Sequence, residues 1–530
     1  MLFTSFRPFA KLHGFMLLWA VTLFVGRGFA SAALEFDEAE QILHAQYLGM
    51  GYATQPPMFE WLLQLWGVWF GGVGLWSLLT LKLALMLITY AAIYQALKRW
   101  LQSPSLAAVL AMSVFVLPQM MWEIPRTLTH TLLATALLAV MAEVLLRTFM
   151  KKTHEPRDWL VHAWLSVLIA GVVLSKYNAV VVLLLGLMSV LVYLPARQRL
   201  MESLRQNWRF WCLTAAVAVL LVLPHVVWLG LNWQLATAPI FQRLGVEESL
   251  TWSERTLQGL SGFAVGLLSF YSTLLVLPAI ALYKRLKNRQ EFNIPLPQKH
   301  AHLVHLTNIY MVFFLLFCLS LVTFMGTHAF RDRWLTPFLF WTPMVVVWGL
   351  SRFDASLKWF TRVAQALLLV LGVLFVIRAP LLGALNKPGW LNVPAEVLAQ
   401  KLDQDFSIGA RVIASNIQLA GDIRLHSKDR SVIFPAYSVY ARQNAQPACE
   451  LLMVSGDFEG KSLSGDETWT PDMLHVVADQ WSLSTQETLS WVETHRATER
   501  QYAIPALYSD QTFQVRALLL KSPHSNHCAY

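Results

Sequence analysis

The sequence predicts an α-helical protein that crosses a membrane many times and carries a small soluble α/β domain at its C-terminal end. Hydrophobic residues make up 56% of the chain and charged residues only 14%, which is outside the range of soluble globular domains. Apolar runs of about 17–25 residues, long enough to cross the hydrocarbon core, recur as far as residue 378. Residues 379–530 are more polar and contain no such run. We therefore expect a transmembrane domain over 1–378 and a soluble domain over 379–530.

The apolar runs predict eleven membrane spans, whose approximate bounds are 12–33, 75–97, 104–121, 128–147, 158–174, 178–195, 210–229, 259–283, 304–325, 335–350 and 363–378. The first run is too long for a removable signal peptide and lacks a cleavage site of small residues. Arg7 and Lys11 precede it and are expected to hold the N-terminus in the cytoplasm.

The distribution of Lys and Arg predicts the orientation. With eleven spans, the loops on the cytoplasmic side receive about three times as many Lys and Arg as the loops on the outer side, which is the positive-inside pattern. The net charge of +9 then anchors the chain against an anionic inner leaflet, and no nucleic-acid partner is needed to explain it. Residues 379–530 are expected on the outer side.

The soluble domain shows alternating strand and helix patterns. Short β-like runs occur at 411–414, 431–434, 451–454 and 515–518, and helical patterns at 394–404 and 486–499. Cys449 and Cys528 lie in this domain. An oxidising compartment would permit a disulfide between them, and two free thiols fit the sequence equally well.

The loop between the first two spans, residues 34–74, holds the most informative residues. It has no Lys or Arg, and acidic residues, among them Asp37, Glu38 and Glu40, cluster where the first span leaves the membrane. An acidic pair at this place suggests a base for chemistry on lipid-linked substrates. These residues also fit local structural roles. Asp37 and Glu40 fit a capping box that opens a helix over 37–50, and Glu38 fits a solvated acid in the first turn of that helix. The tryptophans at 61, 66 and 69 fit an interfacial aromatic belt.

Positive charges on the outer side are few, and five of them, Arg27, Lys82, Lys176, Arg331 and Arg333, are candidates for a task there. Cations at membrane depth are costly unless they pair or face a wet cavity, so they are candidates for function. Together with Asp37 and Glu38 they would suit a cavity that binds the phosphate of a lipid and stabilises it as a leaving group. Lys176 and Arg333 also fit snorkelling side chains, and Arg27 and Lys82 also fit structural ion pairs.

Four motifs taken together resemble the bacterial branch of the protein mannosyltransferase-like superfamily, which includes transferases that modify lipid A and core sugars. These motifs are Asp37-Glu38-Ala39, Tyr52 with Pro56-Pro57, Leu174-Ser175-Lys176-Tyr177 and Arg331-Asp332-Arg333-Trp334-Leu335. The resemblance implies a GT-C fold with two juxtamembrane helices in the first outer loop. It implies transfer of one sugar from a polyprenyl-phosphate donor to a lipid or glycolipid acceptor, such as lipid A or its core sugars, at the periplasmic face of the inner membrane.

The resemblance also assigns roles to residues. Asp37 matches the catalytic base and Glu38 its acidic neighbour, while Tyr52, Gln55, Tyr177 and His130 would line the substrate cavity. Gln55 stands where relatives usually have His, which removes one possible metal ligand. His130, with Thr129 and Thr131, stands where many relatives have an acid, and it also fits an ordinary polar residue at the end of a span.

Other functions have weaker support in the sequence. A divalent metal is possible through His44, His130, Asp37 and Glu38, but these scattered residues form no ligand signature. A transporter or flippase of a lipid-linked glycan would predict inverted repeats and charges near the bilayer midplane, which the sequence lacks. A ligase that transfers a whole lipid-linked glycan would share the outward-facing cavity.

Overall fold

The computed structural model describes residues 7–52, 55–150, 158–237, 251–275, 298–327, 330–351, 357–437, 448–457 and 469–523. By its internal contacts the chain divides into two compact units. The first unit comprises residues 1–21, 49–59 and 82–372, and the second comprises residues 22–48, 60–81 and 373–530. The predicted domain boundary at residue 378 stays a prediction. Cys528 lies outside the described residues, so its pairing with Cys449 is also untested.

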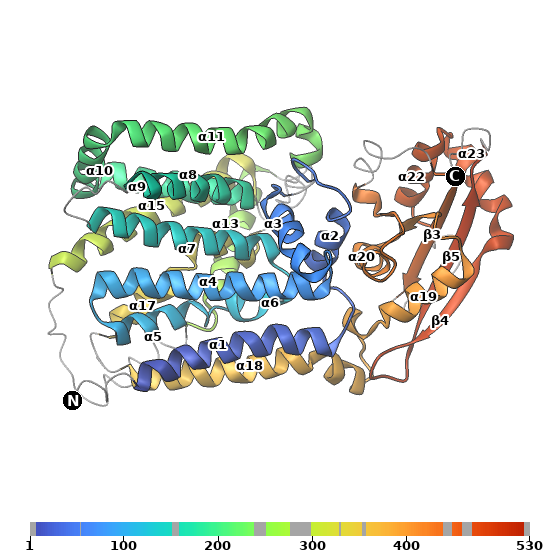
Figure 1. The fold of residues 1–530 in the computed structure, drawn as a ribbon, viewed down its shortest axis with the longest axis horizontal. Coiled ribbons are helices and arrows are strands. Elements are labelled where there is room, and N and C mark those ends of the chain that lie inside the picture. Colours follow the sequence, from blue (N-terminus) through green and yellow to red (C-terminus); the bar gives the residue numbers. More distant parts are fainter. Residues whose placement is uncertain are drawn as a thin grey trace. The chain divides into compact units, whose positions relative to one another are not determined.

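The first unit is a helical bundle (Figure 1). Its helices are α4 (Leu75–Leu101, from Lys82 onward), α5 (Pro104–Val114), the π-helix η2 (Gln119–Glu123), α6 (Ile124–Arg126), α7 (Thr129–Met150), α8 (Asp158–Ser175), α9 (Tyr177–Val192), α10 (Leu194–Gln206), α11 (Trp208–Leu231), α13 (Trp252–Tyr271), α15 (Gln298–Met325), α16 (Asp332–Leu339) and α17 (Thr342–Leu350), with the N-terminal parts of α1 (Arg7–Ala30) and α18 (Lys358–Ala384). Helix α8 packs on α7 and α11, and α16 packs on α7, α9 and α13.

Within the described residues, six helices are long and apolar enough to cross a membrane, and eight spans result if two bent pairs are each counted as one. The six are α1, α4, α7, α11, α15 and α18; the bent pairs are α5 with residues 119–126, and α9 with α10. The chain is therefore a multi-pass membrane protein, as predicted, but the number eleven is not confirmed. The expected span over 335–350 consists of two short helices, α16 and α17. Pro343, at the start of α17, has no N–H to continue the hydrogen bonding of α16, whereas α16 runs on through Pro337.

The second unit contains a five-stranded mixed sheet of order β2-β1-β3-β5-β4. The strands are β1 (Arg411–Ala414), β2 (Val432–Ile433), β3 (Glu450–Asp457), β4 (Arg500–Pro505) and β5 (Thr512–Lys521). Strand β1 pairs in parallel with β2 and β3, whereas β5 pairs antiparallel with β3 and β4. Apolar side chains of β1, β3 and β5 pack against α22 (Pro471–Trp481) and α23 (Thr485–Thr494), and form a core around Ile413, Met453 and Leu518.

The remaining helices of the second unit are α2 (Phe36–His44), most of α3 (Met58–Gly67), the C-terminal parts of α1 and α18, α19 (Ala395–Asp405) and α20 (Ile417–His426), with short 3₁₀ turns over Val68–Phe70, Trp390–Asn392, Pro435–Tyr437 and Arg496–Thr498. Helices α2 and α3 match the two short helices expected in the first loop. Helix α20 packs along α2 (Figure 1).

Candidate functional site

Asp37 lies in the first turn of α2, in the second unit. Helix α2 begins after Glu35, whose backbone is extended (φ −74°, ψ 167°) and whose N–H donates to Glu38 Oε2 over 3.0 Å. The N-cap is therefore Glu35, and the interpretation of Asp37 and Glu40 as a capping box is wrong. The helix also ends at His44, short of the expected residue 50. Asp37 is half-buried, so its carboxylate is partly shielded from water.

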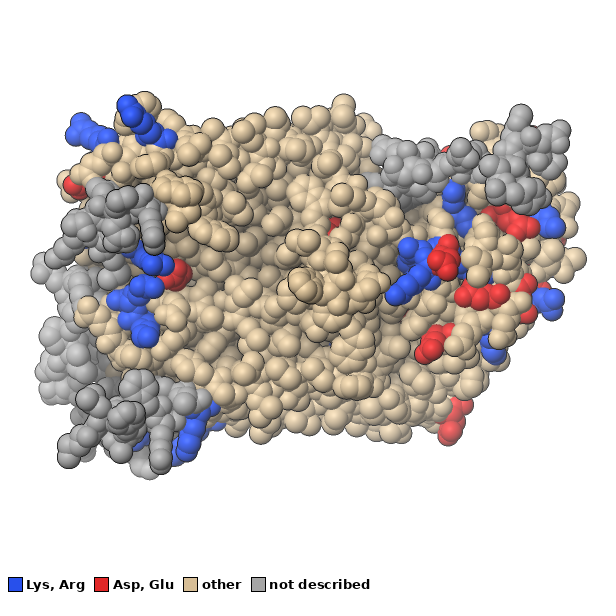
Figure 2. All heavy atoms as spheres, in the orientation of Figure 1, with Lys and Arg blue, Asp and Glu red and all other residues tan. Residues whose placement is uncertain are grey.

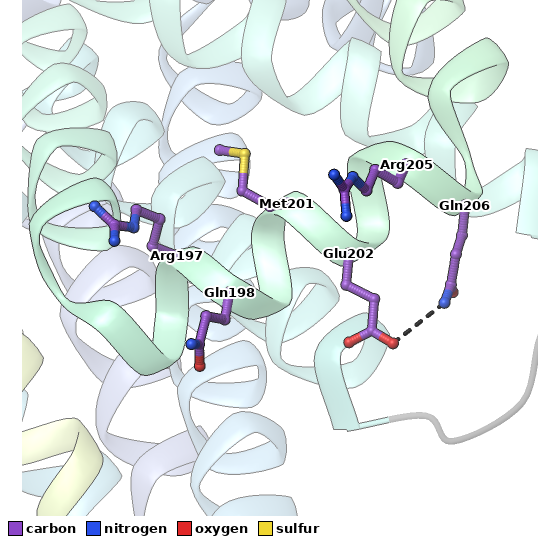
Figure 3. A pocket seen from close by; sticks show the side chains of 6 residues that line it. All are labelled: Arg197, Gln198, Met201, Glu202, Arg205 and Gln206. Atoms are coloured by element: carbon purple, nitrogen blue, oxygen red, sulfur yellow. Dashed lines mark hydrogen bonds between the residues drawn. The ribbon is translucent and has the colours of Figure 1, made fainter.

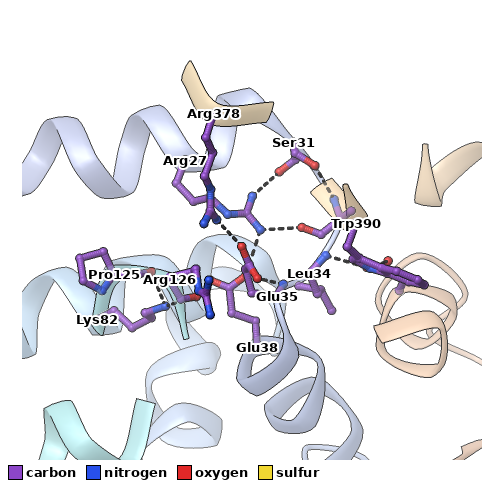
Figure 4. Close-up of polar contacts among 12 residues, drawn as sticks. Arg27, Ser31, Leu34, Glu35, Glu38, Lys82, Pro125, Arg126, Arg378 and Trp390 are labelled. Atoms are coloured by element: carbon purple, nitrogen blue, oxygen red, sulfur yellow. Dashed lines mark hydrogen bonds and ion pairs between the residues drawn. The ribbon is translucent and has the colours of Figure 1, made fainter. Parts of the chain in front are cut away.

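Glu38 and Arg27 form a buried ion pair (Figure 4). Arg27 Nη2 lies 2.9 Å from Glu38 Oε2, and the two side chains are 1% and 0% exposed. The guanidinium of Arg27 also donates to the carbonyls of Ser31 and Ala33, over 2.6 and 2.5 Å. The interpretation of Glu38 as a solvated acid is therefore wrong. The structural ion pair considered for Arg27 is present, and phosphate binding by Arg27 stays a prediction.

In the first unit, the N-terminal ends of α7 and α9 are joined by polar contacts. Lys176, the residue before α9, donates from Nζ to Thr131 Oγ1, and His130 Nδ1 donates to Ser175 O over 3.2 Å. Thr129, at the start of α7, is fully buried and its hydroxyl has no hydrogen-bond partner among the described residues.

The N-terminal end of α16 lies beside the N-terminal ends of α7 and α9. Asn178 Nδ2 donates to the carbonyl of Trp334, in the first turn of α16, over 3.2 Å. Arg331 is exposed, with its guanidinium 5.9 Å from the centre of the Trp334 ring, and Arg333 is half-buried. The N-terminal ends of α7, α9 and α16 thus meet beside Lys176. Helix N-termini carry partial positive charge and unpaired N–H groups, so this arrangement favours an anion.

Residues 49–52 belong to the same unit and contact α11. Tyr52 is buried and its hydroxyl accepts from Gly49 N over 3.1 Å, while Gln55 N donates to Tyr52 O. His225 of α11 donates from Nδ1 to Met50 O over 2.8 Å. Gly51 lies against Trp228, because a Cβ on Gly51 would be only 2.1 Å from its ring.

His225 also stands between two aromatic rings. The ring of Tyr177 stacks on it at 5.8 Å between centres, and the ring of Trp228 stacks on it at the same distance. Sequence reasoning missed His225, although an ionisable residue inside an apolar span is itself a signal of function. Tyr177 thus contacts His225, and His225 bonds to Met50, two residues before Tyr52. The predicted place of Tyr177 and Tyr52 in a substrate cavity stays a prediction.

Lys82 has a different environment from the one expected of a phosphate ligand. It is fully buried in α4, and its Nζ donates to the carbonyl of Pro125 over 2.8 Å (Figure 4). A second carbonyl, that of Arg126, lies 3.5 Å away. These carbonyls end α6, where a cation is favourable. The ammonium group therefore binds backbone, and its predicted contact with phosphate stays a prediction.

The other end of the first unit is basic. Exposed Lys and Arg gather at the end of the bundle where α10 lies (Figure 2), and they include Lys98, Arg99, Arg147, Arg197, Arg199, Arg205 and Arg209. A surface hollow lies along α10, lined by Arg197, Met201, Glu202 and Arg205 among others (Figure 3). Because α10 follows the C-terminal end of α9, about 24 Å along that helix from Lys176, this hollow is separate from the cluster at the N-terminal ends.

The candidate metal ligands of the sequence do not come together in the described residues. In the described part of the chain, no group of three or more His, Cys, Asp or Glu side chains could hold a metal ion. His44 Nδ1 instead lies 3.1 Å from Glu60 Oε1 in a buried pair, and Glu38 bonds to Arg27. The residues present therefore do not fit the divalent cation that the sequence left possible.

Comparison with known proteins finds one matching family and two similar transferases. The dolichyl-phosphate-mannose-protein mannosyltransferase family matches residues 54–228. The lipopolysaccharide core galacturonosyltransferase RgtB of Rhizobium johnstonii is 30% identical over 319 residues, which are 59% of this chain and 60% of that protein, so the match covers less than two thirds of its length. The galacturonosyltransferase RgtA of the same organism is 29% identical over 76% of this chain and 78% of its own.

Solved structures give the same fold. ArnT from Cupriavidus metallidurans matches in the apo state with a TM-score of 0.52 at 12% identity, over 97% of this chain and 98% of that one. The crystal structure of ArnT bound to undecaprenyl phosphate matches with a TM-score of 0.50 at 13% identity, over 95% and 97% of the two chains. The family resemblance predicted from the motifs is confirmed, and the predicted enzyme class, a glycosyltransferase, is the class that the matched family and both curated relatives share.

Proposed function

We propose that this chain is a membrane glycosyltransferase that moves a single sugar from a polyprenyl-phosphate donor to a hydroxyl group of a lipid acceptor at the periplasmic face of the inner membrane. The names of the curated relatives favour a galacturonosyl unit as the sugar and the lipopolysaccharide core as the acceptor. The observation that carries the proposal is the meeting of the N-terminal ends of α7, α9 and α16 beside Lys176.

This arrangement suits a phosphate that gains charge during the reaction. The glycosidic bond to the donor phosphate breaks heterolytically, and its electron pair stays on the phosphate oxygen. The ammonium group of Lys176 and the ends of the three helices offer fixed positive charge for that oxygen, and such charge stabilises the transition state more than the ground state. Arg331 and Arg333, which flank the first residue of α16, would complete the phosphate site.

The acceptor hydroxyl needs a base, and Asp37 is the best candidate. Its neighbour Glu38 already accepts from Arg27 and from the N–H of Glu35, so Glu38 serves to fix the start of α2 rather than to take a proton. Asp37 would accept the hydroxyl proton while the oxygen attacks the anomeric carbon opposite the phosphate, which inverts its configuration. Base assistance of this kind is worth about two to four orders of magnitude in rate.

The test of the phosphate site uses purified protein, a radiolabelled polyprenyl-phosphate galacturonic acid and lipopolysaccharide core. We expect Lys176→Ala to lower transfer by about tenfold or more, since removing one transition-state donor typically costs two to three orders of magnitude. Lys98→Ala is the matched control, because Lys98 is exposed at the basic end of the bundle. Equal activity of the two variants would contradict the phosphate site. Movement of intact donor across a vesicle membrane without sugar transfer would instead support a flippase.

A further inference from the structure

A buried carboxyl group of the soluble domain bonds to the segment that precedes α2. Asp422, on α20, is fully buried. Its Oδ1 accepts from the backbone N–H of Leu34 and its Oδ2 accepts from Trp390 Nε1, each over 2.8 Å. Leu34 directly precedes Glu35, the N-cap of α2. Asp422 therefore fixes the chain at the point where α2 begins, and all these residues belong to the second unit.

The two helices also touch at a position that admits only glycine. A Cβ on Gly421 would lie 2.5 Å from Ala39 Cβ and 2.6 Å from Ala39 Cα. Both distances are shorter than real carbon contacts, and one involves backbone, so a larger residue would push the helices apart. Ala39 is fully buried and lies two residues after Asp37 on α2.

A third contact holds the chain just beyond the C-terminal end of α2. The side-chain amide of Gln46 donates to Val432 O over 2.9 Å, and its oxygen accepts from Val432 N over 3.0 Å. Gln46 thereby pairs with the backbone of β2, an edge strand of the sheet. Helix α2 is thus fixed before its start, at its middle and after its end by residues of the soluble domain.

We propose that the soluble domain sets the position of the catalytic base, and that Asp422 and Gly421 are positioning residues for Asp37. The inference rests on the proposed function, in which Asp37 accepts the acceptor proton. It gives the soluble domain a part in the chemical step. A displacement of about 1 Å at a reacting group can lower a rate about a hundredfold, so small movements of α2 are enough.

The experiment compares Gly421→Ala and Asp422→Ala with wild type in the full-length protein, reconstituted in lipid nanodiscs. Two quantities are measured: kcat and KM for the polyprenyl-phosphate sugar, and amide hydrogen exchange of residues 34–46 without substrate. We expect kcat to fall by about ten- to a hundredfold, KM to stay nearly constant, and exchange of residues 34–46 to accelerate. Asp422→Asn keeps an oxygen for Leu34 and loses the acceptor for Trp390, so its kcat should lie between those of wild type and Asp422→Ala.

Two control variants change the same domain away from α2. In Gly409→Ala the added Cβ would lie near only one atom, Ser407 Oγ, at 3.5 Å. Asp403→Ala removes a carboxylate that accepts from Ser427 and Arg430 within the domain, over 2.8 and 2.6 Å. Both should keep kcat at a temperature where the protein is folded, even if Asp403→Ala lowers Tm.

Each possible result supports or contradicts the inference. Unchanged exchange at residues 34–46 in both test variants would show that α20 does not hold α2. Faster exchange with an unchanged kcat would show that the contact exists without positioning the base. A loss of kcat in Asp403→Ala equal to that in Asp422→Ala would assign the effect to domain stability. Because hydrogen exchange needs no substrate, it decides the contact even if the wild-type protein transfers no sugar, in which case the proposed function would be wrong instead.

Discussion

The buried pair between Arg27 and Glu38 predicts a large loss of stability when one partner is removed. Arg27 is 1% exposed and Glu38 0% exposed, so Glu38→Ala leaves a guanidinium cation away from water. Removal of one partner of a buried pair typically costs about 3–5 kcal/mol. Arg27 keeps its bonds to the carbonyls of Ser31 and Ala33, so we expect a value near the lower end, about 3 kcal/mol.

The first unit offers a matched control for this prediction. Arg99 Nε lies 2.9 Å from Glu143 Oε1, the same separation as in the Arg27–Glu38 pair, but Arg99 is 42% exposed. Exposed pairs contribute about 0–1 kcal/mol, so Glu143→Ala should lower the unfolding free energy by no more than that. The two pairs thus differ mainly in burial.

The assay is unfolding of detergent-solubilised protein by increasing mole fractions of sodium dodecyl sulfate, followed by tryptophan fluorescence. Replacing both partners by apolar residues, as in Arg27→Met with Glu38→Leu, should recover much of the stability lost in Glu38→Ala, because no charge is then left buried. Equal destabilisation by Glu38→Ala and Glu143→Ala would refute the reasoning from burial.

Gly51→Ala should weaken donor use, because its Cβ would come within 2.1 Å of the Trp228 ring and displace residues 49–52. Gly186→Ala, whose added Cβ meets nothing within 4 Å, should leave the KM for the donor unchanged. Equal KM values for the two variants would contradict the prediction. Burial raises the pKa of Asp422 to about 8 from its ordinary 3.8. Between these two pH values the folded protein holds a proton that the unfolded chain has released, so the free energy of unfolding should fall as pH rises. Asp422→Asn should flatten this slope, and an unchanged slope in that variant would show that other groups cause the pH dependence. A reporter fused after Tyr530 should be active only in its periplasmic form, and a cytoplasmic signal would overturn the proposed orientation.

The sequence alone predicted the membrane class and most helices, because an apolar run long enough to span the bilayer is stable only in a hydrocarbon environment. It failed at 335–350, where the apolar run continues through Pro337 and Pro343 and only the backbone reveals two short helices. It also missed β4, whose pattern of two buried residues, Tyr502 and Ile504, among exposed ones gives a weak strand signal.

The candidate site was predictable by residue type but not by environment. Asp37, Glu38 and Lys176 were singled out as candidates from their placement at span ends, yet the sequence could not distinguish a solvated Glu38 from a buried one. The difference depends on Arg27, which lies in the preceding span and meets Glu38 only through tertiary structure. Asp422 gave no signal either, since its contacts with Leu34 and Trp390 join segments far apart in the sequence.

Single-turnover transfer by Asp37→Asn tests whether Asp37 acts as the base in sugar transfer from a lipid phosphate. Donor affinity and Tm are determined on the same preparation. We expect a rate lower by about two to four orders of magnitude, with donor affinity and Tm close to those of wild type. An Asn variant that keeps more than about a tenth of the wild-type rate would contradict it, because base assistance is worth far more than that.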